Sequence, residues 1–431
     1  MQFEGIYAPV ITPYHSDFSL NQDALEATIN RLIEAGVHGL IIAGTTGEYY
    51  AQSSDERVEM MSVAHEIIAG RRPMIVGTGA IRTEDSILYA KAAKKAGADA
   101  LLIETTQDLL QAKAAVNGAR EAIDKADHDI VLIVQVTVEA TGTMLLGSEI
   151  GAALNALEPL QIDLIGLNCA TGPAEMSEHL RVLAKNSSVA ISVMPNAGLP
   201  QLGPNGATYP LGPDELADYL NDFVNSYGLT LVGGCCGTTP AHMKAVVAKL
   251  DGHKIVSRNV AKEIGASSLY QFVPFRQDLA YMAIGERANA NGSRAFRDAL
   301  LIEDWQSCIE IARDQIRDGA HMLDLSVDYV GRDGVADMRE LASRLATSST
   351  LPIVLDSTEP AVLKAGLEHL GGRSVINSVN YEDGDGPTST FANIMPLVKD
   401  HGASVVGLTI GEEGQARDAE RKLRIARRLI N

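Results

Sequence analysis

Cysteine, cationic side chains and long apolar runs are scarce in this sequence, and each scarcity excludes a class of protein. Four cysteines in 431 residues are too few for a disulfide framework, so we expect a reduced protein. No uninterrupted apolar run approaches about 18 residues, the length that a membrane-spanning helix needs. The start, Met1-Gln-Phe-Glu, lacks a basic region followed by an apolar core. We therefore expect a cytoplasmic protein without a signal peptide and without a membrane partner.

The shortage of positive charge excludes a second class. The 36 Lys and Arg residues are outnumbered by 55 Asp and Glu residues, which gives a formal net charge of −19. A surface for nucleic acid or for an anionic membrane needs clusters of Lys and Arg, so we expect neither partner. With 46% hydrophobic residues, the chain is long enough for one α/β barrel of typical size and part of another.

Short apolar runs alternate with helical patterns, which predicts a parallel α/β sheet. The first helix has Leu25, Ile29, Leu32 and Ile33 on one face and ends at Gly36, and a capping box from Ser53 to Glu56 begins the next. Eight strand-helix units in residues 1–252 predict a complete (β/α)8 TIM barrel. We expect its strands at residues 8–13, 39–43, 74–76, 100–103, 130–136, 164–168, 189–193 and 229–232.

Residues 253–280 do not continue this alternation of strand and helix, and they are interpreted as a linker on the surface. A second series of units fills residues 281–431, with a last helix from about residue 415. Its strands are expected near residues 283–286, 321–325, 352–355, 374–376 and 404–408. Five units cannot close a barrel, so we expect a truncated second (β/α) barrel with an unpaired apolar edge and a tendency to self-associate.

Three cysteines follow predicted strands. Cys235 and Cys236 lie in Val232-Gly-Gly-Cys-Cys-Gly-Thr-Thr-Pro240, and Cys169 follows the strand at residues 164–168. Loops at the carboxyl ends of barrel strands hold the active sites of such enzymes, and three thiolates with one open position suit catalytic zinc. The alternative is that all three are small buried side chains. Cys308, in a helical stretch beside Trp305, is interpreted as packing.

The turn Gly44-Thr-Thr-Gly-Glu48 follows the second predicted strand. Its backbone N–H groups and the hydroxyls of Thr45 and Thr46 could hold a small carboxylate, although the same residues also make an ordinary turn. With Val10-Ile-Thr-Pro13, this stretch makes residues 1–103 resemble the dihydrodipicolinate synthase and N-acetylneuraminate lyase family. That resemblance implies a pyruvate-dependent aldolase, with a Schiff-base lysine at the end of strand six.

The chain lacks that lysine. The sixth strand ends with Asn168 and Cys169, and without an amine nucleophile no Schiff base forms. We assign every lysine before residue 252 to a helical stretch or a flanking loop, namely Lys91, Lys94, Lys95, Lys113, Lys125, Lys185, Lys244 and Lys249. Residues 1–103 are thus interpreted as an aldolase half-barrel without its chemistry.

Residues 104–431 are similar to a different family. Asn168-Cys-Ala-Thr-Gly172, Met194-Pro-Asn-Ala-Gly198 and Gly233-Gly-Cys-Cys-Gly237 resemble the homocysteine-binding barrel of cobalamin-dependent methionine synthase. Ser267–Phe275 and Gly285-Glu-Arg-Ala-Asn289 resemble the methyltetrahydrofolate-binding domain that follows in that family. We interpret residues 1–252 as a hybrid barrel, with its junction at residues 97–103, and residues 281–431 as a partial pterin-binding domain.

The second resemblance implies a zinc ion held by Cys169, Cys235 and Cys236, with the homocysteine sulfur in the open position. Zinc would present the substrate as a thiolate, and no further catalytic residue is expected. Asn168 is assigned to substrate binding and Glu104 would pair with the substrate ammonium; alternatively, Glu104 is a solvated carboxylate at the rim. The family's Asp-Gly-x-Met-Gly-Thr stretch is replaced here by residues 8–14 and the Gly44–Glu48 turn. We therefore expect zinc binding to survive and homocysteine affinity to be reduced.

Four polar residues of the second series lie at or just past strand ends. Side chains of this kind can hydrogen-bond the edge of a pterin ring, and the resemblance implies that use, although Asp and Asn are also common in caps and turns. They are Asn289, Asp324, Asp356 and Asn377. Ala288 stands where the family has Thr. Because the last three strands of that barrel are missing, we expect this chain not to bind folate.

The sequence therefore supports one function before two alternatives. The first is a zinc-dependent homocysteine S-methyltransferase module, which we expect to be incomplete because the family's methyl carrier, cobalamin, needs a domain that we do not expect in this chain. The second is a lyase of the dihydrodipicolinate synthase type. The third is a zinc-binding barrel without catalytic activity.

Overall fold

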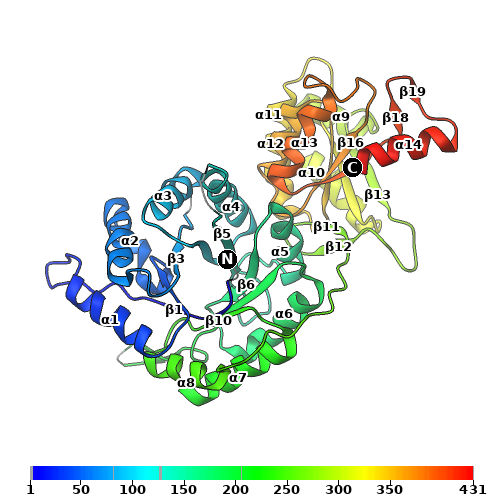
Figure 1. Cartoon of the computed structure of the whole chain (residues 1–431). Helices are drawn as coiled ribbons and strands as arrows, with labels where there is room; N and C mark the ends of the chain where they lie inside the picture. The colour runs from blue at the N-terminus through cyan, green and yellow to red at the C-terminus, as the bar shows by residue number, and fades with distance from the viewer. Residues whose placement is uncertain (1–2, 81, 126–128, 205, 431) are drawn as a thin grey trace. The chain divides into compact units, whose positions relative to one another are not determined.

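The computed structural model describes residues 3–80, 82–125, 129–204 and 206–430, and the chain divides into two compact units. Unit 1 contains residues 1–146 and 161–262, and unit 2 contains residues 147–160 and 263–431. Each unit is built around its own parallel sheet (Figure 1).

A closed barrel of eight parallel strands forms unit 1 in the described part of the chain, so the predicted TIM barrel is confirmed. The strand order around the barrel is β1-β10-β7-β6-β5-β4-β3-β2. Its strands are β1 (Gly5–Pro9), β2 (Gly39–Ile42), β3 (Met74–Gly77), β4 (Ala100–Thr106), β5 (Val131–Val136), β6 (Leu164–Asn168), β7 (Ala190–Met194) and β10 (Leu231–Gly233). β1 begins earlier than the predicted strand at residues 8–13, because the Gly5 N–H already donates to Thr230 O at 2.9 Å.

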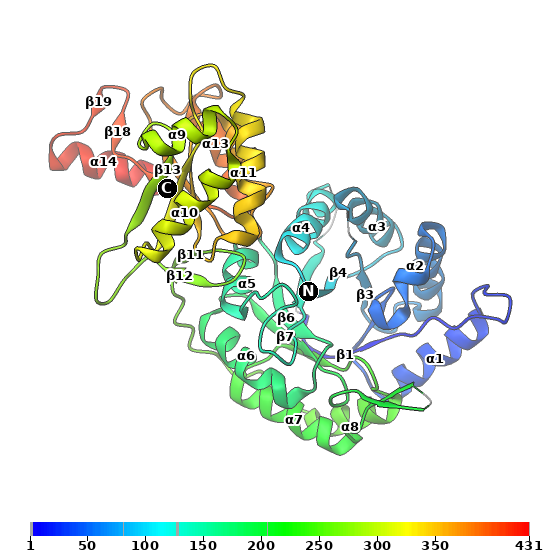
Figure 2. The ribbon, with the colours of Figure 1, turned by 180° about the vertical axis from the view of Figure 1, so that it is seen from behind.

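A helix follows each barrel strand, and seven of them ring unit 1 from outside (Figure 2). On the predicted apolar face of α1, Leu25, Ile29 and Leu32 are buried and Ile33 is half-buried. The predicted capping box at Ser53 begins α2. Pro173, Pro213 and Pro240 each begin a helix, where the missing N–H costs nothing. The helices are α1 (Gln22–Glu34), α2 (Ser54–Ile68), α3 (Thr83–Lys95), α4 (Leu109–Ile123), α5 (Ile150–Leu157), α6 (Pro173–Asn186), α7 (Pro213–Tyr227) and α8 (Pro240–Leu250).

Side chains fill the barrel interior. Tyr7 of β1 stacks on Phe3 and lies directly over Gly39 of β2, where a Cβ atom would come within 2.0 Å of the Tyr7 ring. Glycine at position 39 thus makes room for an aromatic ring inside the barrel. The same cluster includes Ile41, Ile75, Leu102, Ile133, Leu164, Met194 and Leu231.

Short elements interrupt the loops at the carboxyl ends of the strands. After β2 come two single turns of 3-10 helix, η1 (Thr45–Gly47) and η2 (Tyr49–Ala51). After β7, the hairpin of β8 (Gln201–Gly203) and β9 (Gly206–Thr208) is exposed throughout, and the sequence did not predict it. No described lysine before residue 252 lies at the carboxyl end of a strand, in agreement with the sequence analysis.

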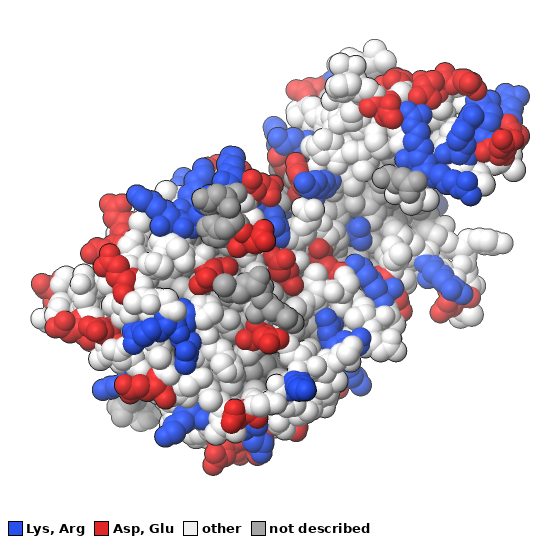
Figure 3. Space-filling model, viewed as in Figure 1, with Lys and Arg blue, Asp and Glu red and all other residues white. Residues whose placement is uncertain are grey.

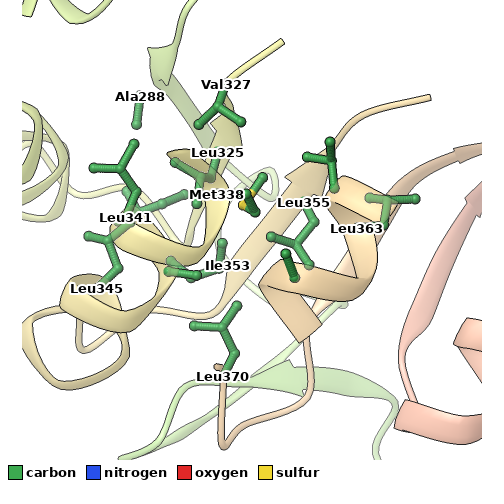
Figure 4. Close-up of a cluster of buried hydrophobic side chains, with 14 of the residues drawn as sticks. Ala288, Leu325, Val327, Met338, Leu341, Leu345, Ile353, Leu355, Leu363 and Leu370 are labelled. Atoms are coloured by element: carbon green, nitrogen blue, oxygen red, sulfur yellow. The ribbon is translucent and has the colours of Figure 1, made fainter. Parts of the chain in front are cut away.

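Unit 2 contains an open sheet of five parallel strands in sequential order, β13-β14-β15-β16-β17. They are β13 (Ile284–Asn289), β14 (Met322–Ser326), β15 (Ile353–Asp356), β16 (Val375–Val379) and β17 (Ser404–Gly407). The helices are α9 (Arg294–Leu301), α10 (Trp305–Arg317), α11 (Gly334–Ser348), α12 (Pro360–Leu367), α13 (Thr390–His401) and α14 (Ala419–Ile430). Leu325 and Leu355 of the sheet pack against Met338 and Leu341 of α11 and Leu363 of α12 (Figure 4).

The predicted surface linker is partly wrong. Residues 265–274 form a hairpin of β11 (Gly265–Ser267) and β12 (Phe272–Pro274), and its Ala266 and Val273 are buried against Met322 of β14. Helix α5 and the single turn η3 (Glu158–Leu160) also belong to unit 2, where the Asn155 side chain donates to Gly265 O at 3.3 Å. Apolar residues in this stretch are separated by turns rather than by a strand-helix period, so the sequence pattern concealed the hairpin.

The edges of the open sheet are exposed, as expected. Along β13, Ile284 is 42% exposed, and β17 is half-buried at the other edge. Helix α14 follows a small hairpin, β18 (Ile410–Gly411) and β19 (Gly414–Gln415), that the sequence did not predict. On the face shown in Figure 3, acidic and basic side chains are interspersed. No described helix is long and apolar enough to cross a membrane.

Candidate metal centre

Cys169 occupies a strained turn at the end of β6. Both Cys169 and Ala170 have positive φ angles, 61° and 56°, a conformation that non-glycine residues adopt rarely. The Cys169 N–H donates to Met194 O at 3.1 Å, and the Thr171 N–H donates to Cys169 O at 2.7 Å. Strain of this kind persists where the surroundings fix the backbone, and here it holds the thiol at the rim.

Cys235 and Cys236 follow β10 and are tied to the loop after β7. The Cys235 N–H donates to Pro195 O at 2.8 Å, and the Cys236 N–H donates to the Asn196 side-chain oxygen at 3.0 Å. The Thr238 hydroxyl donates to Cys235 O at 2.7 Å. Asn196 lies in the predicted Met194–Gly198 motif, but its role as an acceptor could not be deduced from the sequence.

The three sulfur atoms converge. The Sγ atoms of Cys169, Cys235 and Cys236 all lie within 4.8 Å of one another, and Cys169 Sγ is 3.8 Å from Cys236 Sγ. Zinc–sulfur bonds of about 2.3 Å at tetrahedral angles place two sulfurs about 3.8 Å apart, so this donor set fits a zinc ion. Cys235 is buried while the other two are half-buried, which leaves one side of the cluster accessible.

The thiols share their protons unequally. Hydrogen bonds from Cys169 and then from Cys235 lower the pKa of Cys236 to about 3. The hydrogen bonds that Cys235 makes to Cys169 and to Cys236, with its burial, raise the pKa of Cys235 well above its usual value. Loss of the first thiol proton is therefore favoured, and loss of a second is disfavoured. A divalent cation among the sulfurs would make further deprotonation favourable, because a bound metal deprotonates a coordinating thiol.

Glu104 lies within β4 and not beyond its end, and it is not a solvated rim carboxylate. Its Oε1 accepts a short hydrogen bond from the Thr45 N–H, and its Oε2 accepts from the Asn168 side-chain amide at 3.3 Å. Burial raises the pKa of Glu104, and the hydrogen bonds from Thr45 partly offset that effect. The carboxylate is fixed in place beside the cysteine cluster.

Residues of the Gly44–Glu48 turn also reach the site. Thr46 Oγ1 lies 3.9 Å from Cys235 Sγ. Thr45 is engaged within the protein, since its N–H binds Glu104 and its hydroxyl donates to Thr105 Oγ1 at 3.1 Å. Thr45, in the first half of the barrel, therefore orients Glu104 beside the cysteine cluster. Its N–H is occupied by Glu104 and is not available to a ligand.

Arg57 is a buried cation that the sequence analysis missed. Its guanidinium lies between the rings of Tyr49 and Tyr89, 4.3 and 4.1 Å from their centroids, and donates to Gly77 O at 2.7 Å. Burial lowers the pKa of Arg57, while the negative charge of Glu104 opposes that shift. Arg57 directly follows the capping box of α2, and no sequence pattern marks that position as buried.

In unit 2, three of the four predicted pterin-binding residues meet. The Asn289 side-chain amide donates to Asp324 Oδ2 at 2.8 Å and to Asp356 Oδ2 at 3.0 Å. Burial raises the pKa of Asp324 to about 6 and also raises that of Asp356. Asn377 pairs with Asp356 in the strand register, so it lies at the same level of the sheet. Cys308 is buried in the core, as predicted.

Family comparisons match both units. The model of the homocysteine S-methyltransferase family matches residues 15–250, and that of the pterin-binding enzymes matches residues 285–430. The first match extends through both halves of the barrel and includes most of residues 1–103, for which the sequence suggested a different family.

Curated relatives are similar over most of the chain. Methionine synthase of Mycobacterium tuberculosis (strain ATCC 25618 / H37Rv) is 67% identical over 335 residues, and that of Mycobacterium leprae (strain TN) is 64% identical over 340 residues. Each alignment covers 78% of this chain but 28% of the relative, so the chain spans little more than a quarter of their length.

Among solved structures, a dihydrodipicolinate synthase from Agrobacterium tumefaciens str. C58 aligns with a TM-score of 0.40 and 22% identity. The alignment covers 57% of this chain and 74% of that protein.

Proposed function

Because the chain belongs to the homocysteine S-methyltransferase family, we propose that unit 1 binds zinc and homocysteine and transfers a methyl group to the homocysteine sulfur. The convergence of Cys169, Cys235 and Cys236 supports this proposal above all else. When bound, zinc would supply the Lewis acid that keeps the substrate sulfur a thiolate at neutral pH. The sulfur then forms a bond to the methyl carbon while the bond from that carbon to its donor breaks.

The protein's own side chains would bind and orient the amino acid. Glu104 is placed to accept hydrogen bonds from the substrate ammonium. Asn168 and Thr45 hold the two carboxylate oxygens of Glu104 in position. Thr46, beside Cys235, would contact the substrate near its sulfur. Charged groups fixed in a partly buried site need no rearrangement when the ligand arrives, which favours binding.

Homocysteine binding is expected to be weaker than in the family at large. Residues 8–14 and the Gly44–Glu48 turn replace the stretch that helps to seat the amino acid there, and the Thr45 N–H is occupied by Glu104. We propose that residues 1–103 form the atypical half of the barrel, that residues 104–252 supply the zinc ligands, and that residues 253–280 connect them to residues 281–431.

For unit 2 we propose a pterin site at Asn289, Asp324, Asp356 and Asn377. The amide of Asn289 and the carboxyl groups offer donors and acceptors that match the N–H and C=O edge of a pterin ring. The open sheet provides one side of such a site. Binding of methyltetrahydrofolate is therefore expected to be weak. Calorimetric titration of the chain with methyltetrahydrofolate measures the affinity.

Metal content tests the proposal for unit 1. The purified chain is expected to hold about one zinc per chain by elemental analysis, and the Cys235→Ala/Cys236→Ala double variant is expected to hold none. Cys308→Ala is the matched control, because that thiol is buried in unit 2 and should leave the zinc content unchanged. A folded wild-type chain without zinc would contradict the proposal.

Activity is assayed with homocysteine and free methylcobalamin as the methyl donor, because the sequence resemblance implies cobalamin chemistry. Methionine formation that disappears in the double variant is the expected result. Zinc without any homocysteine-dependent change in thiol reactivity would instead favour a zinc-binding barrel without turnover.

The lyase alternative is tested by borohydride trapping. An enzyme that forms a Schiff base with pyruvate becomes covalently labelled, whereas we expect no label here because no described lysine before residue 252 ends a strand.

The cytoplasm remains the proposed location, since all four cysteines are free thiols.

A further inference from the structure

Two residues in a strained conformation lie at the ends of the Gly44–Glu48 turn. Ala43, just before the turn, and Glu48, its last residue, have positive φ angles of 54° and 60°, which non-glycine residues adopt rarely. Such a conformation persists where the surroundings hold the backbone in place. The turn carries the Thr45 N–H that binds Glu104, so the groups that hold the turn also fix that carboxylate.

Arg57 of α2 is a buried group that joins this turn to strand β3. Its guanidinium lies over the ring of Tyr49, the residue directly after the turn, and over the ring of Tyr89 in α3. It also donates to Gly77 O at 2.7 Å and to Gly79 O at 3.3 Å. Arg57 is only 3% exposed, and a guanidinium keeps its proton in proteins. Its positive charge is therefore stabilised by two aromatic faces and by backbone carbonyl oxygens.

Two glycines connect the position of Arg57 to that of Glu104. A Cβ atom at Gly77 would come within 3.0 Å of Gly44 Cα, and a Cβ atom at Gly44 would come within 2.5 Å of Glu104 Oε1. Because neither position has a side chain, the end of β3, the turn and the carboxylate are in direct contact. A shift of the Gly77 carbonyl after loss of Arg57 would therefore displace the turn against Glu104.

We propose that Arg57 is a positioning residue of the homocysteine site, which holds the Gly44–Glu48 turn so that the Thr45 N–H keeps Glu104 in place for the substrate ammonium. The inference rests on the proposed homocysteine site. A carboxylate that is already fixed loses no freedom when the ligand arrives, so it binds more tightly than a mobile one. The contacts that carry this role involve no cysteine, so Arg57 should affect homocysteine binding and leave zinc binding unchanged.

Hydrogen exchange of the ligand-free chain, followed by mass spectrometry, tests whether Arg57 holds the turn. In Arg57→Gln, which loses the charge and the planar guanidinium, peptides from residues 44–52 should exchange about 5-fold faster, as expected when one hydrogen bond is lost. Arg31→Gln, at an exposed arginine of α1, is the matched control and should exchange like wild type.

A second pair of variants covers the case in which Arg57→Gln does not fold. Tyr49→Leu leaves Arg57 in place and removes the ring on the side of the turn, so it should also speed exchange in residues 44–52. Tyr49→Phe keeps an aromatic ring over the guanidinium and should restore slow exchange. Wild-type exchange in Tyr49→Leu, or in a folded Arg57→Gln variant, would overturn the proposal.

Calorimetric titration of the zinc-loaded chain tests the link to the substrate. Arg57→Gln should lower homocysteine affinity about 5-fold at unchanged zinc content. In a Glu104→Gln background the same substitution should have no further effect, because Arg57 acts through Glu104.

The two backgrounds separate a positioning role from general loosening of unit 1. An equal loss of affinity in both would overturn the role of Arg57 and leave the homocysteine site intact. A wild-type chain that binds zinc but no homocysteine would overturn the proposed substrate site itself, and with it the substrate role of Arg57, even if the exchange results hold.

Discussion

Asn168 donates its side-chain amide to Glu104 Oε2 at 3.3 Å, and so the residue before Cys169 holds the carboxylate expected to bind the substrate. The same side chain accepts from the Thr105 N–H at 2.8 Å and donates to the Thr105 hydroxyl at 2.7 Å. Asn168 is fully buried and all its polar groups are used. It thus joins β4 to β6 immediately below the cysteine cluster.

Replacing Asn168 by Ala is expected to destabilise unit 1. The Thr105 N–H would lose its acceptor in a partly buried setting, at a cost of about 1–3 kcal/mol in the free energy of unfolding. Urea unfolding followed by circular dichroism measures the change. Asn225→Ala, at an exposed asparagine of α7, is the control and should stay within about 0.5 kcal/mol of wild type. Equal stability of the two variants would contradict the assigned role.

Glu104→Gln is expected to weaken homocysteine binding while leaving zinc bound. The amide retains an oxygen acceptor but loses the negative charge, and a hydrogen bond to a charged group contributes about 1.5–3 kcal/mol. Calorimetric titration of the zinc-loaded chain should show homocysteine affinity lower by about 10-fold or more. Glu48→Gln serves as the control, because Glu48 is an exposed glutamate at the end of the Gly44–Glu48 turn. An unchanged affinity in Glu104→Gln would remove Glu104 from the substrate site.

Much of this arrangement could be predicted from the sequence where local pattern and position suffice. Strand β6 has the predicted bounds, and the thiols of Cys169, Cys235 and Cys236 meet because parallel strands of a barrel end at one rim. Similarly, Asn289, Asp324 and Asp356, near the carboxyl ends of β13, β14 and β15, meet in unit 2.

The rest depends on contacts between distant residues that carry no local signal. The hydrogen bond from Thr45 to Glu104 joins residues 59 positions apart, and the hydrogen bond from the Cys236 N–H to the Asn196 side chain joins residues 40 positions apart. Strands of three residues, such as β8 and β11, are too short to show an alternating pattern. Burial of Arg57 follows from two aromatic rings on separate elements.

Gly39→Ala is expected to destabilise the barrel. The added methyl group would overlap the Tyr7 ring, which is stacked on Phe3 and packed in the barrel interior. Overpacking of this kind costs about 1–3 kcal/mol. Urea unfolding monitored by circular dichroism measures the loss of stability. The control variant is Gly203→Ala, whose Cβ would lie 3.7 Å from its nearest neighbour. If both variants unfold at the same urea concentration, Tyr7 does not depend on the space at Gly39.

Asp324 should make unit 2 less stable as the pH rises from about 4 to 6. Its pKa in the folded chain, about 6, lies above the ordinary value of 3.8, chiefly because of burial. The unfolded chain therefore loses this proton first, and folding stability falls with increasing pH until Asp324 ionises in the folded chain as well. Asp324→Asn should remove this dependence and raise stability at pH 7, since the amide stays neutral and can still accept from Asn289.

Trp305 allows the measurement on unit 2 alone, because it is the one tryptophan of the chain and lies in α10. The urea midpoint from its fluorescence is compared at pH 4.5 and 7 in wild type, Asp324→Asn and the exposed-site control Asp400→Asn. Wild type and the control should lose stability between these pH values relative to Asp324→Asn. A parallel response of all three proteins would mean that Asp324 is ionised at an ordinary pH, and the buried acid–amide cluster would then need another source of stabilisation.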